Sequence, residues 1–351
     1  MKDCYLSRNY KGIDSAGNKA KTDIEEIMSD IGFQNVGLPQ TTYNNKIASF
    51  VLTLAGVLKA PFGLGKGDNL VLQYPLKKYF VFLCNMAHMR GAKVITLIHD
   101  LGSFRRKALT IEKEIWRLNH SDYIIAHNEV MKQWLIDHGC KAKKIGVLEI
   151  FDFFSNAKRK EKTKVEKPFK VVYAGALAQR KNAFLYEVGN YINNYKFELY
   201  GSGFDKEKAA GSEHIEYKGF VKADKLIATV DADFGLVWDG SSVDTCSGNF
   251  GEYLQYNNPH KTSLYLRCGL PVIIWKKAAM ARFIEQNRIG ICIDSLKELD
   301  DILGNLTTEQ YMEMIHNLQE ISMLIGNGYY AQAAIEDAAA WLTEKRWLRE
   351  K

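Results

Sequence analysis

The chain has 351 residues, of which 46% are hydrophobic and 25% are charged, and its formal net charge is +6. This length predicts two domains, because single hydrophobic cores stop growing near about 250–300 residues. The composition excludes a disordered or fibrous chain, and the modest positive charge favours a small anionic ligand or an anionic surface over dedicated nucleic-acid binding.

Six cysteines are scattered along the chain without a C-x-x-C pair, and several lie in apolar runs. This pattern is typical of buried thiols in a reducing cytosol. The first residues contain no apolar signal core, and we expect no run of about 18 apolar residues that could span a bilayer. The sequence therefore predicts a cytoplasmic protein. Peripheral contact with the inner face of the cell membrane and homo-oligomer formation stay open.

Short apolar strands alternate with amphipathic helical patterns, which predicts α/β domains built on doubly wound parallel sheets. In the first half, one helix begins near Gly17 and ends at Gly32, and another runs from Asn128 to Gly139. The strands expected in this half are 4–7, 69–72, 94–98, 123–126 and 145–148.

Two segments of the first half carry candidate functional residues. A long polar loop, 6–19, follows the first strand, and its glycines and Ser15 could admit a sugar or phosphate; a merely flexible loop is the alternative. His99 and Asp100 stand at the end of the buried strand 94–98, where either could act as a general base. A structural role for Asp100 in capping the following turn is the competing interpretation.

A basic stretch, 155–167, separates the two halves and contains almost no apolar residue. It predicts a solvated linker, with contact to anionic lipid headgroups as the alternative. The strands expected after it are 170–173, 197–200, 215–217, 234–237, 272–274 and 290–293. Beyond residue 295 the pattern is helical only, and it ends in an Ala-rich helix over about 329–347. Ligands of such a chain are expected between the carboxyl ends of the two sheets.

Several polar groups follow strands of the second half. Arg180 and Lys181 come after the strand 170–173, just before a helix that we expect Asn182 to cap, and could face a phosphate leaving group; a plain surface pair is the alternative. Gly201 begins a Gly-x-Gly turn that would allow close approach of a ligand, with an ordinary turn as the alternative. The pair Asp231 and Asp233 precedes a strand, so we reject a metal-binding D-x-D motif there.

The segment 256–266 reads YNNPHKTSLYL and gives the strongest indication of a ligand site. Asn258 suits a helix N-cap and Pro259 suits the first helical position. His260 and Lys261 would then lie among first-turn N–H groups that have no internal partner, so a diphosphate could bind there. A capped core helix with a solvated lysine is the alternative.

Together these motifs resemble glycosyltransferases of the GT-B architecture. More narrowly, the chain resembles the bacterial family of β-1,6-galactofuranosyltransferases and accessory glucosyltransferases of serine-rich adhesins. The resemblance implies an acceptor-binding Rossmann-like domain over 1–154 with the terminal helix 329–351, the linker 155–167, and a nucleotide-sugar-binding domain over 168–328. It also implies that the two domains face a cleft and that the terminal helix crosses back to the first domain.

The resemblance assigns roles to individual residues. Asp100 would be the base, with His99 second; Tyr217 would lie near the nucleotide base and the Gly17–Asn18 loop would approach the donor from the first domain. The expected donor-binding residues are Gly17, Asn18, Arg180, Lys181, Gly201, Tyr217, Asn257, Asn258, His260, Lys261 and Thr262.

The predicted reaction is inverting, metal-independent and cofactor-independent transfer of galactofuranose, glucose or a similar sugar from a UDP-sugar to a hydroxyl of a growing glycan. The acceptor could be lipid-linked or protein-linked, and no nucleic-acid partner is expected. A nucleotide-sugar epimerase, or a non-catalytic glycan- or nucleotide-binding partner subunit, is the alternative.

Overall fold

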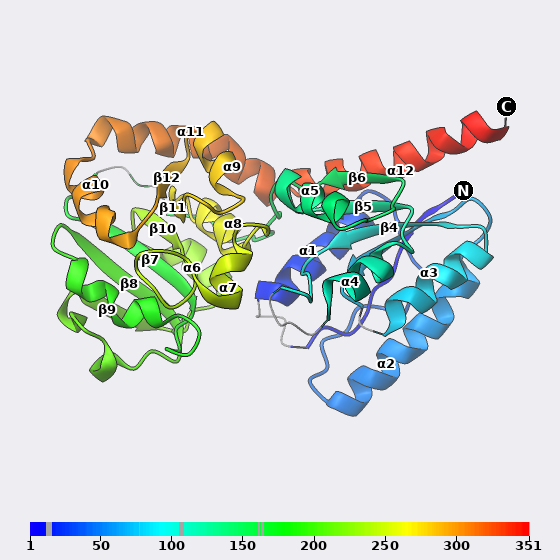
Figure 1. The fold of residues 1–351 in the computed structure, drawn as a ribbon, viewed down its shortest axis with the longest axis horizontal. Coiled ribbons are helices and arrows are strands. Elements are labelled where there is room, and N and C mark those ends of the chain that lie inside the picture. Colours follow the sequence, from blue (N-terminus) through cyan, green and yellow to red (C-terminus); the bar gives the residue numbers. More distant parts are fainter. Residues whose placement is uncertain (12–15, 77, 105–108, 161, 163–164, 351) are drawn as a thin grey trace. The chain divides into compact units, whose positions relative to one another are not determined.

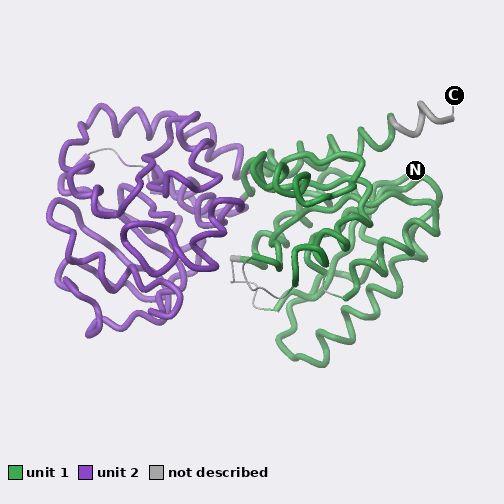
Figure 2. Tube along the Cα trace, viewed as in Figure 1, with its two compact units in different colours: residues 1–152, 328–351 green, residues 153–327 purple. Residues whose placement is uncertain are grey.

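A computed structural model describes the chain except for residues 12–15, 77, 105–108, 161, 163–164 and 351. It divides into two compact units, shown in Figure 2: unit 1 comprises residues 1–152 with 328–351, and unit 2 comprises residues 153–327. Each unit is a six-stranded parallel sheet covered by helices. The predicted α/β fold class is therefore confirmed.

The sheet of unit 1 has the strand order β2-β1-β3-β4-β5-β6, and all its pairs are parallel. The central strands β3 and β4 are almost continuously buried, because helices cover both faces of such a sheet. From β1 the chain passes to β2 on one side and then to β3 on the other, so the winding direction reverses between β1 and β3. The strands are β1 (Asp3–Tyr5), β2 (Gln34–Asn35), β3 (Asn69–Tyr74), β4 (Lys93–Ile98), β5 (Tyr123–Ala126) and β6 (Lys144–Val147).

The helices of unit 1 follow the apolar periodicity of the sequence. The first helix buries Ile24, Ile27 and Met28 against the sheet. The fifth begins after Asn128, whose side chain accepts a hydrogen bond from the Met131 N–H at 2.9 Å, as predicted. The elements are α1 (Ala16–Asp30), α2 (Lys46–Lys59), the 3₁₀ turn η1 (Ala60–Gly63), α3 (Tyr79–Met89), α4 (Ile111–Leu118), α5 (Glu129–Asp137) and α12 (Tyr329–Glu350).

The sheet of unit 2 has the order β12-β11-β10-β7-β8-β9 and is also parallel throughout. From β7 the chain adds β8 and β9 on one side, then returns to place β10 on the other side of β7. The winding direction therefore reverses between β7 and β10, and ligands of doubly wound sheets bind at the carboxyl ends of such strands. The strands are β7 (Phe169–Ala176), β8 (Tyr195–Ser202), β9 (Ile215–Gly219), β10 (Phe234–Val237), β11 (Val272–Trp275) and β12 (Gly290–Ile293).

Short helical turns fill the β7–β8 connection of unit 2, where we predicted a helix capped by Asn182. That prediction is wrong: the Asn182 side chain makes no cap hydrogen bond, and instead donates to the Ala176 carbonyl and accepts from the Gly240 N–H. The helical elements are η2 (Ala183–Tyr186), η3 (Val188–Tyr191), η4 (Lys206–Lys208), η5 (Ser212–His214), α6 (Ala223–Thr229), α7 (Gly248–Tyr253), α8 (His260–Arg267), α9 (Ala281–Gln286), η6 (Leu296–Glu298), α10 (Leu299–Asn305) and α11 (Thr308–Gly326).

The basic stretch 155–167 belongs to unit 2, and residues 161, 163 and 164 of it lie outside the described part of the chain. Lys162 forms an ion pair with Asp233, and Lys170 pairs with Asp231 at 2.7 Å. Both carboxylates precede β10, so they lie at the amino edge of the sheet, away from its carboxyl ends. Part of the basic stretch is thus fixed on unit 2 by a buried carboxylate.

The terminal helix α12 packs on unit 1, as predicted. The Tyr123 hydroxyl donates to the Asp337 carboxylate at 2.8 Å. At the start of the helix, the Asp152 carboxylate accepts hydrogen bonds from the N–H groups of Tyr330 and Ala331, at 3.3 and 2.6 Å. Asp152 is the last residue of the first segment of unit 1, so this cap holds α12 at the point where the chain leaves the unit.

One apolar stretch differs from expectation. The 18-residue window Lys46–Gly63, which covers α2 and η1, has a mean hydropathy of 1.3 and is long and apolar enough to cross a membrane by these criteria alone. Only 28% of the window is buried. Our expectation that no such stretch exists is wrong. Isolated polar residues interrupt the apolar run, but the mean hydropathy of the whole window stays high.

Burial of Asp152 generates a pH prediction. Burial raises the pKa of this carboxyl from 3.8 to about 7 and outweighs the two cap N–H groups that favour its charged form. A carboxyl whose pKa is higher in the folded state stabilises the fold at low pH, and this contribution is lost as pH rises from about 4 to about 7. We therefore expect the Tm of Asp152→Asn, relative to wild type, to rise by roughly 5 °C between pH 5 and pH 8 in scanning calorimetry. A pH-independent difference would contradict this assignment.

Candidate functional site

The carboxyl ends of β7 and β10 carry a compact polar cluster in unit 2, formed by Lys261, Tyr173 and Asp239. The Lys261 ammonium donates to the Tyr173 hydroxyl at 3.0 Å and to Asp239 Oδ1 at 3.1 Å. The Tyr173 hydroxyl donates to the same carboxylate oxygen at 3.0 Å. We call this set the Lys261 cluster. It lies where the winding direction of the sheet reverses.

The Lys261 cluster is mostly buried but still reachable from solvent. The side chains of Lys261 and Asp239 are 15% and 13% exposed. The ammonium also lies 4.2 Å from the centre of the Tyr173 ring, a cation–π contact. Burial and the neighbouring Asp239 raise the pKa of Tyr173 well above its ordinary value, so its hydroxyl stays neutral. The cluster therefore holds one cation at fixed position in a poorly hydrated setting.

Helix α8 positions Lys261 through Tyr265, one turn further along. The Tyr265 hydroxyl accepts a hydrogen bond from the Ala174 N–H at 2.8 Å, which fixes the helix to β7. On β10, a Cβ added to Gly235 would lie 2.1 Å from the Tyr265 ring, so only glycine allows this approach. Because residues four apart share a helix face, anchoring Tyr265 directs Lys261 to the same sheet edge.

The start of α8 lies one residue later than predicted. Pro259 is the N-cap, with extended backbone, and His260 is the first helical residue; no side chain makes a cap hydrogen bond. Asn258, the predicted cap, is buried and only 4% exposed. The residue before a proline is disfavoured in the helical region, but here the proline itself is also extended, which shifts the start of the helix. The His260 ring packs near Phe153, at 5.2 Å between ring centres.

Two buried oxygens beside the start of α8 have no hydrogen-bond partner among the residues that the structure describes. They are Asn257 Oδ1 and Thr262 Oγ1. Leaving a buried polar group without a partner costs about 1–3 kcal/mol. A ligand hydroxyl or phosphate at this point would supply the missing partners, so these atoms indicate a polar ligand next to Lys261.

The turn after β7 brings Arg180 and Lys181 to the same edge of the sheet. Arg180 is exposed, and the Lys181 ammonium lies 5.0 Å from the centre of the Phe250 ring. Asn182 connects this turn to Gly240 in the loop after β10. The predicted cations therefore share a sheet edge with the Lys261 cluster.

Gly201 and Tyr217 lie on the other side of β7. Gly201 is next to Gly175 in the ladder, and a Cβ there would lie 1.8 Å from the Gly175 carbonyl oxygen at a φ of +149°. Packing alone therefore requires glycine at this position. The Tyr217 hydroxyl donates to the Gly201 carbonyl at 3.0 Å, and its ring is 42% exposed. The ligand role of both residues stays a prediction.

In unit 1, His99 and Asp100 follow β4 at the carboxyl edge of the sheet. His99 Nε2 lies 2.6 Å from Gln73 Oε1, and the Gln73 amide nitrogen donates to the Lys21 carbonyl at 3.1 Å. These partners place the proton of a neutral His99 on Nε2. The ring stacks on Phe151 at 5.4 Å. Asp100 is half-buried.

Gly17 and Asn18 lie in the first turn of α1. Gly17 is exposed, with open space around it, and the Asn18 amide donates to the Lys11 carbonyl. Residues 12–15 of the predicted polar loop, including Ser15, lie outside the described residues. The predicted approach of the Gly17–Asn18 loop to the donor stays a prediction.

The structure adds three polar residues to those that sequence reasoning assigned to a site. Tyr173 and Asp239 form the Lys261 cluster, and the position of Asp239 just beyond the strand 234–237 was the available signal. The third is Glu25 on α1, which accepts hydrogen bonds from the hydroxyls of Ser7 and Tyr10. Burial raises the pKa of Glu25 to about 7. Glu25 lies between Ile24 and Ile27, which form the buried apolar face of α1, so nothing in the sequence indicates that its side chain is also buried.

No group of three or more His, Cys, Asp or Glu side chains arranged to hold a metal occurs among the described residues. The polar groups at this edge are the Lys261 ammonium, the Asp239 carboxylate that pairs with it, a tyrosine, amides and hydroxyls. These are suited to binding an anion by hydrogen bonds and charge.

Two units, each a doubly wound parallel sheet with flanking helices, define a class of protein, the GT-B fold of glycosyltransferases. The structure is similar to the solved structure of Anabaena Alr3699/HepE in complex with UDP, with a TM-score of 0.61, 15% sequence identity, and coverage of 98% of this chain and 100% of that one. It is also similar to the lipopolysaccharide outer core galactosyltransferase WaaB, with a TM-score of 0.61, 12% identity, and coverage of 97% and 99%.

The chain belongs to the glucosyltransferase 3-like family. The N-terminal domain model of that family matches residues 3–150 and the C-terminal domain model matches residues 171–338. The chain is 33% identical to the β-1,6-galactofuranosyltransferase WbbI of Escherichia coli K12 over 325 residues, which cover 92% of this chain and 94% of that protein. It is 24% identical to glucosyltransferase 3 of Streptococcus gordonii, with coverage of 91% and 92%. The chain is therefore a glycosyltransferase.

Proposed function

We propose that this glycosyltransferase binds a UDP-sugar at the Lys261 cluster and transfers its sugar, galactofuranose or glucose or a similar hexose, to a hydroxyl of a growing glycan. The transfer proceeds with inversion and without a metal ion. The relatives support the choice of sugar, since one is named as a β-1,6-galactofuranosyltransferase and another as a glucosyltransferase. The structurally similar HepE protein is described in complexes with UDP and with UDP-glucose.

One observation carries the donor assignment: the start of α8 carries a fixed ammonium, and two buried oxygens of the same segment, Asn257 Oδ1 and Thr262 Oγ1, have no partner in the described structure. The ammonium has three N–H donors, and Tyr173 and Asp239 accept two of them, which leaves one for a phosphate oxygen. The Thr262 hydroxyl can donate to the same diphosphate. The side-chain amide oxygen of Asn257, Oδ1, can accept a hydrogen bond from a ribose hydroxyl.

This arrangement would also promote the chemistry. Breaking the bond between sugar and diphosphate leaves negative charge on the departing UDP, and a preorganised cation stabilises that charge most strongly where water is scarce. The first-turn N–H groups of α8 add the positive end of the helix dipole. Arg180, exposed at the same sheet edge, can add a second charge. Together these groups supply electrostatic stabilisation of the leaving group from protein residues.

The acceptor hydroxyl must lose a proton during transfer, and we assign this role to Asp100. His99 is the weaker candidate, because Nε2 of its ring already donates to Gln73. Asp100 is half-buried and directly follows β4, at the carboxyl edge of the sheet. A carboxylate in such a position can accept a proton from a sugar hydroxyl.

Replacing Lys261 tests the donor site. We expect Lys261→Ala to weaken UDP binding about 10- to 100-fold, because a hydrogen bond to a charged group contributes about 1.5–3 kcal/mol. Isothermal titration calorimetry with UDP measures the loss directly. Lys276→Ala is the matched control, since Lys276 is an exposed lysine of unit 2 that pairs with Asp294. Unchanged UDP affinity in the Lys261 variant would overturn the assignment.

Replacing Asp100 tests the base. We expect Asp100→Asn to bind UDP as well as wild type does but to lose sugar transfer by about 100-fold or more, the usual contribution of a general base. A radiolabelled-sugar transfer assay measures turnover. Asp137→Asn, a substitution at an exposed position of α5, should change neither quantity. Near-normal turnover in Asp100→Asn would show that another residue is the base.

A further inference from the structure

Helix α2 of unit 1 presents apolar side chains to solvent along one face. Ile47, Val51 and Leu58 are 75%, 55% and 51% exposed, and Phe62 in the following turn is 85% exposed. Their spacing of four, seven and four residues places them on one helical stripe. A helix on the surface of a folded unit normally packs its apolar stripe against the core. In α2 this apolar stripe faces solvent instead.

Positive charge accompanies the apolar stripe, and acidic residues are missing from the surrounding sequence. Between Asp30 and Asp100 the chain contains one carboxylate, Asp68, which is only 3% exposed. The same interval contains seven lysine and arginine residues: Lys46, Lys59, Lys66, Lys77, Lys78, Arg90 and Lys93. Of these, Lys46 and Lys59 lie on α2 and Lys78 lies at the start of α3, and all three are exposed, whereas Lys93 pairs with Asp122 at 3.6 Å. The exposed charges described on α2 and at the start of α3 are therefore all positive.

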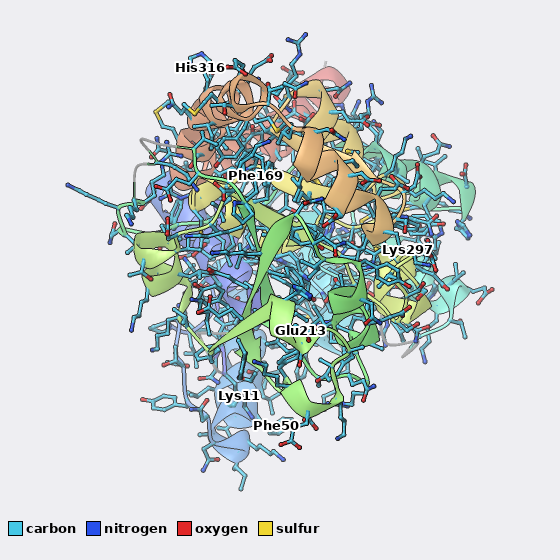
Figure 3. All side chains as sticks on the ribbon, turned by 90° about the vertical axis from the view of Figure 1, so that its left-hand side faces the viewer. Lys11, Phe50, Phe169, Glu213, Lys297 and His316 are labelled. Atoms are coloured by element: carbon cyan, nitrogen blue, oxygen red, sulfur yellow. The ribbon has the colours of Figure 1, made fainter. Side chains whose placement is uncertain are left out.

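Lysine and aromatic side chains meet directly on this surface. The Lys78 ammonium, at the start of α3, lies 5.2 Å from the centre of the Phe50 ring on α2. Figure 1 shows α2 and α3 side by side, and Figure 3 labels Phe50 on α2. Phe50 itself is 50% exposed. We call the exposed side chains of α2, η1 and the start of α3 the α2 surface.

The α2 helix is anchored to unit 1 along its opposite face. Gly56, Val57 and Ala60 are buried, and a Cβ on Gly56 would contact Leu38 at 3.4 Å. The 14-residue helix is about 21 Å long, shorter than the hydrocarbon core of a bilayer at about 30 Å. Such a helix, fixed along one face to the unit, can lie in the plane of a membrane surface.

We propose that the α2 surface docks on an anionic lipid bilayer, with the exposed apolar stripe in the boundary between headgroups and acyl chains. Apolar burial and attraction of lysines to anionic headgroups are the two forces that bind an interfacial helix, and the α2 surface supplies both. A second copy of the chain fits less well, because pairing two such surfaces would bring like charges together. This inference concerns unit 1 and goes beyond the proposed donor site in unit 2.

Vesicle co-sedimentation tests the proposal with the full chain. Wild-type protein is mixed with vesicles of phosphatidylcholine containing 30% phosphatidylglycerol, or of phosphatidylcholine alone. We expect binding to the anionic vesicles, at least tenfold weaker binding to the neutral ones, and a decline as salt increases. Absence of binding to the anionic vesicles would overturn the proposal.

The decisive variant replaces Ile47, Val51 and Leu58 together by glutamine. These side chains are exposed, so the fold should be preserved, and we expect anionic-vesicle binding to fall at least tenfold while UDP affinity stays within twofold. The matched control carries glutamine in place of three exposed apolar residues of unit 2, Phe220, Met312 and Met323, and should bind vesicles as wild type does. Wild-type vesicle binding by the α2 variant would overturn the proposal.

A charge variant and a measurement of self-association complete the test. Replacing Lys46 and Lys78 by glutamine should reduce the preference for anionic over neutral vesicles at least threefold. Sedimentation equilibrium without lipid should give wild type and the α2 variant the same mass. If the variant instead converted a dimer to a monomer and left vesicle binding unchanged, the α2 surface would be an interface between copies, and the proposal would be wrong. The UDP affinity of the α2 variant should stay at the wild-type level whether the α2 surface binds lipid or a second copy. A loss of vesicle binding with retained UDP affinity is therefore independent of the proposed donor site.

Discussion

The hydrogen-bonded contact of Lys261 with Asp239 and Tyr173 is the interaction that organises the proposed donor site. It joins the carboxyl ends of β7 and β10 to the first turn of α8, three elements far apart in sequence. The parallel sheet creates the location, because its winding direction reverses between these strands. The tyrosine and the carboxylate then fix an ammonium where an anionic ligand can bind.

We infer that this contact serves donor binding more than stability. A buried ion pair must offset the cost of removing both charges from water, so it often contributes little to folding. Tyr173 and Asp239 satisfy two donors of the ammonium, and Asn257 and Thr262 keep oxygens without partners in the described structure. A diphosphate would complete these hydrogen bonds. The hydrogen bonds that these groups do not make in the folded protein could then contribute to the free energy of donor binding.

The sequence predicted the fold better than the detailed contacts. The alternation of strands and helices was sufficient for two doubly wound sheets, and YNNPHKTSLYL was sufficient to single out Lys261. The cap at Asn258 was misplaced by one residue, because local propensity does not reveal that Pro259 stays outside the helix. Asp239, Tyr173 and the bridging role of Asn182 were missed because they depend on the order of strands. The exposure of α2 could not be predicted either, since an apolar helix is normally a buried one.

Binding of uridine, UMP and UDP to wild type and to Lys261→Ala, measured by calorimetry under one set of conditions, tests the central claim most directly. If the Lys261 ammonium contacts the diphosphate, the substitution weakens UDP by tenfold or more and leaves uridine within about twofold, because each charge-assisted hydrogen bond contributes about 1.5–3 kcal/mol. Equal losses for all three ligands, or no loss for UDP, would contradict the account.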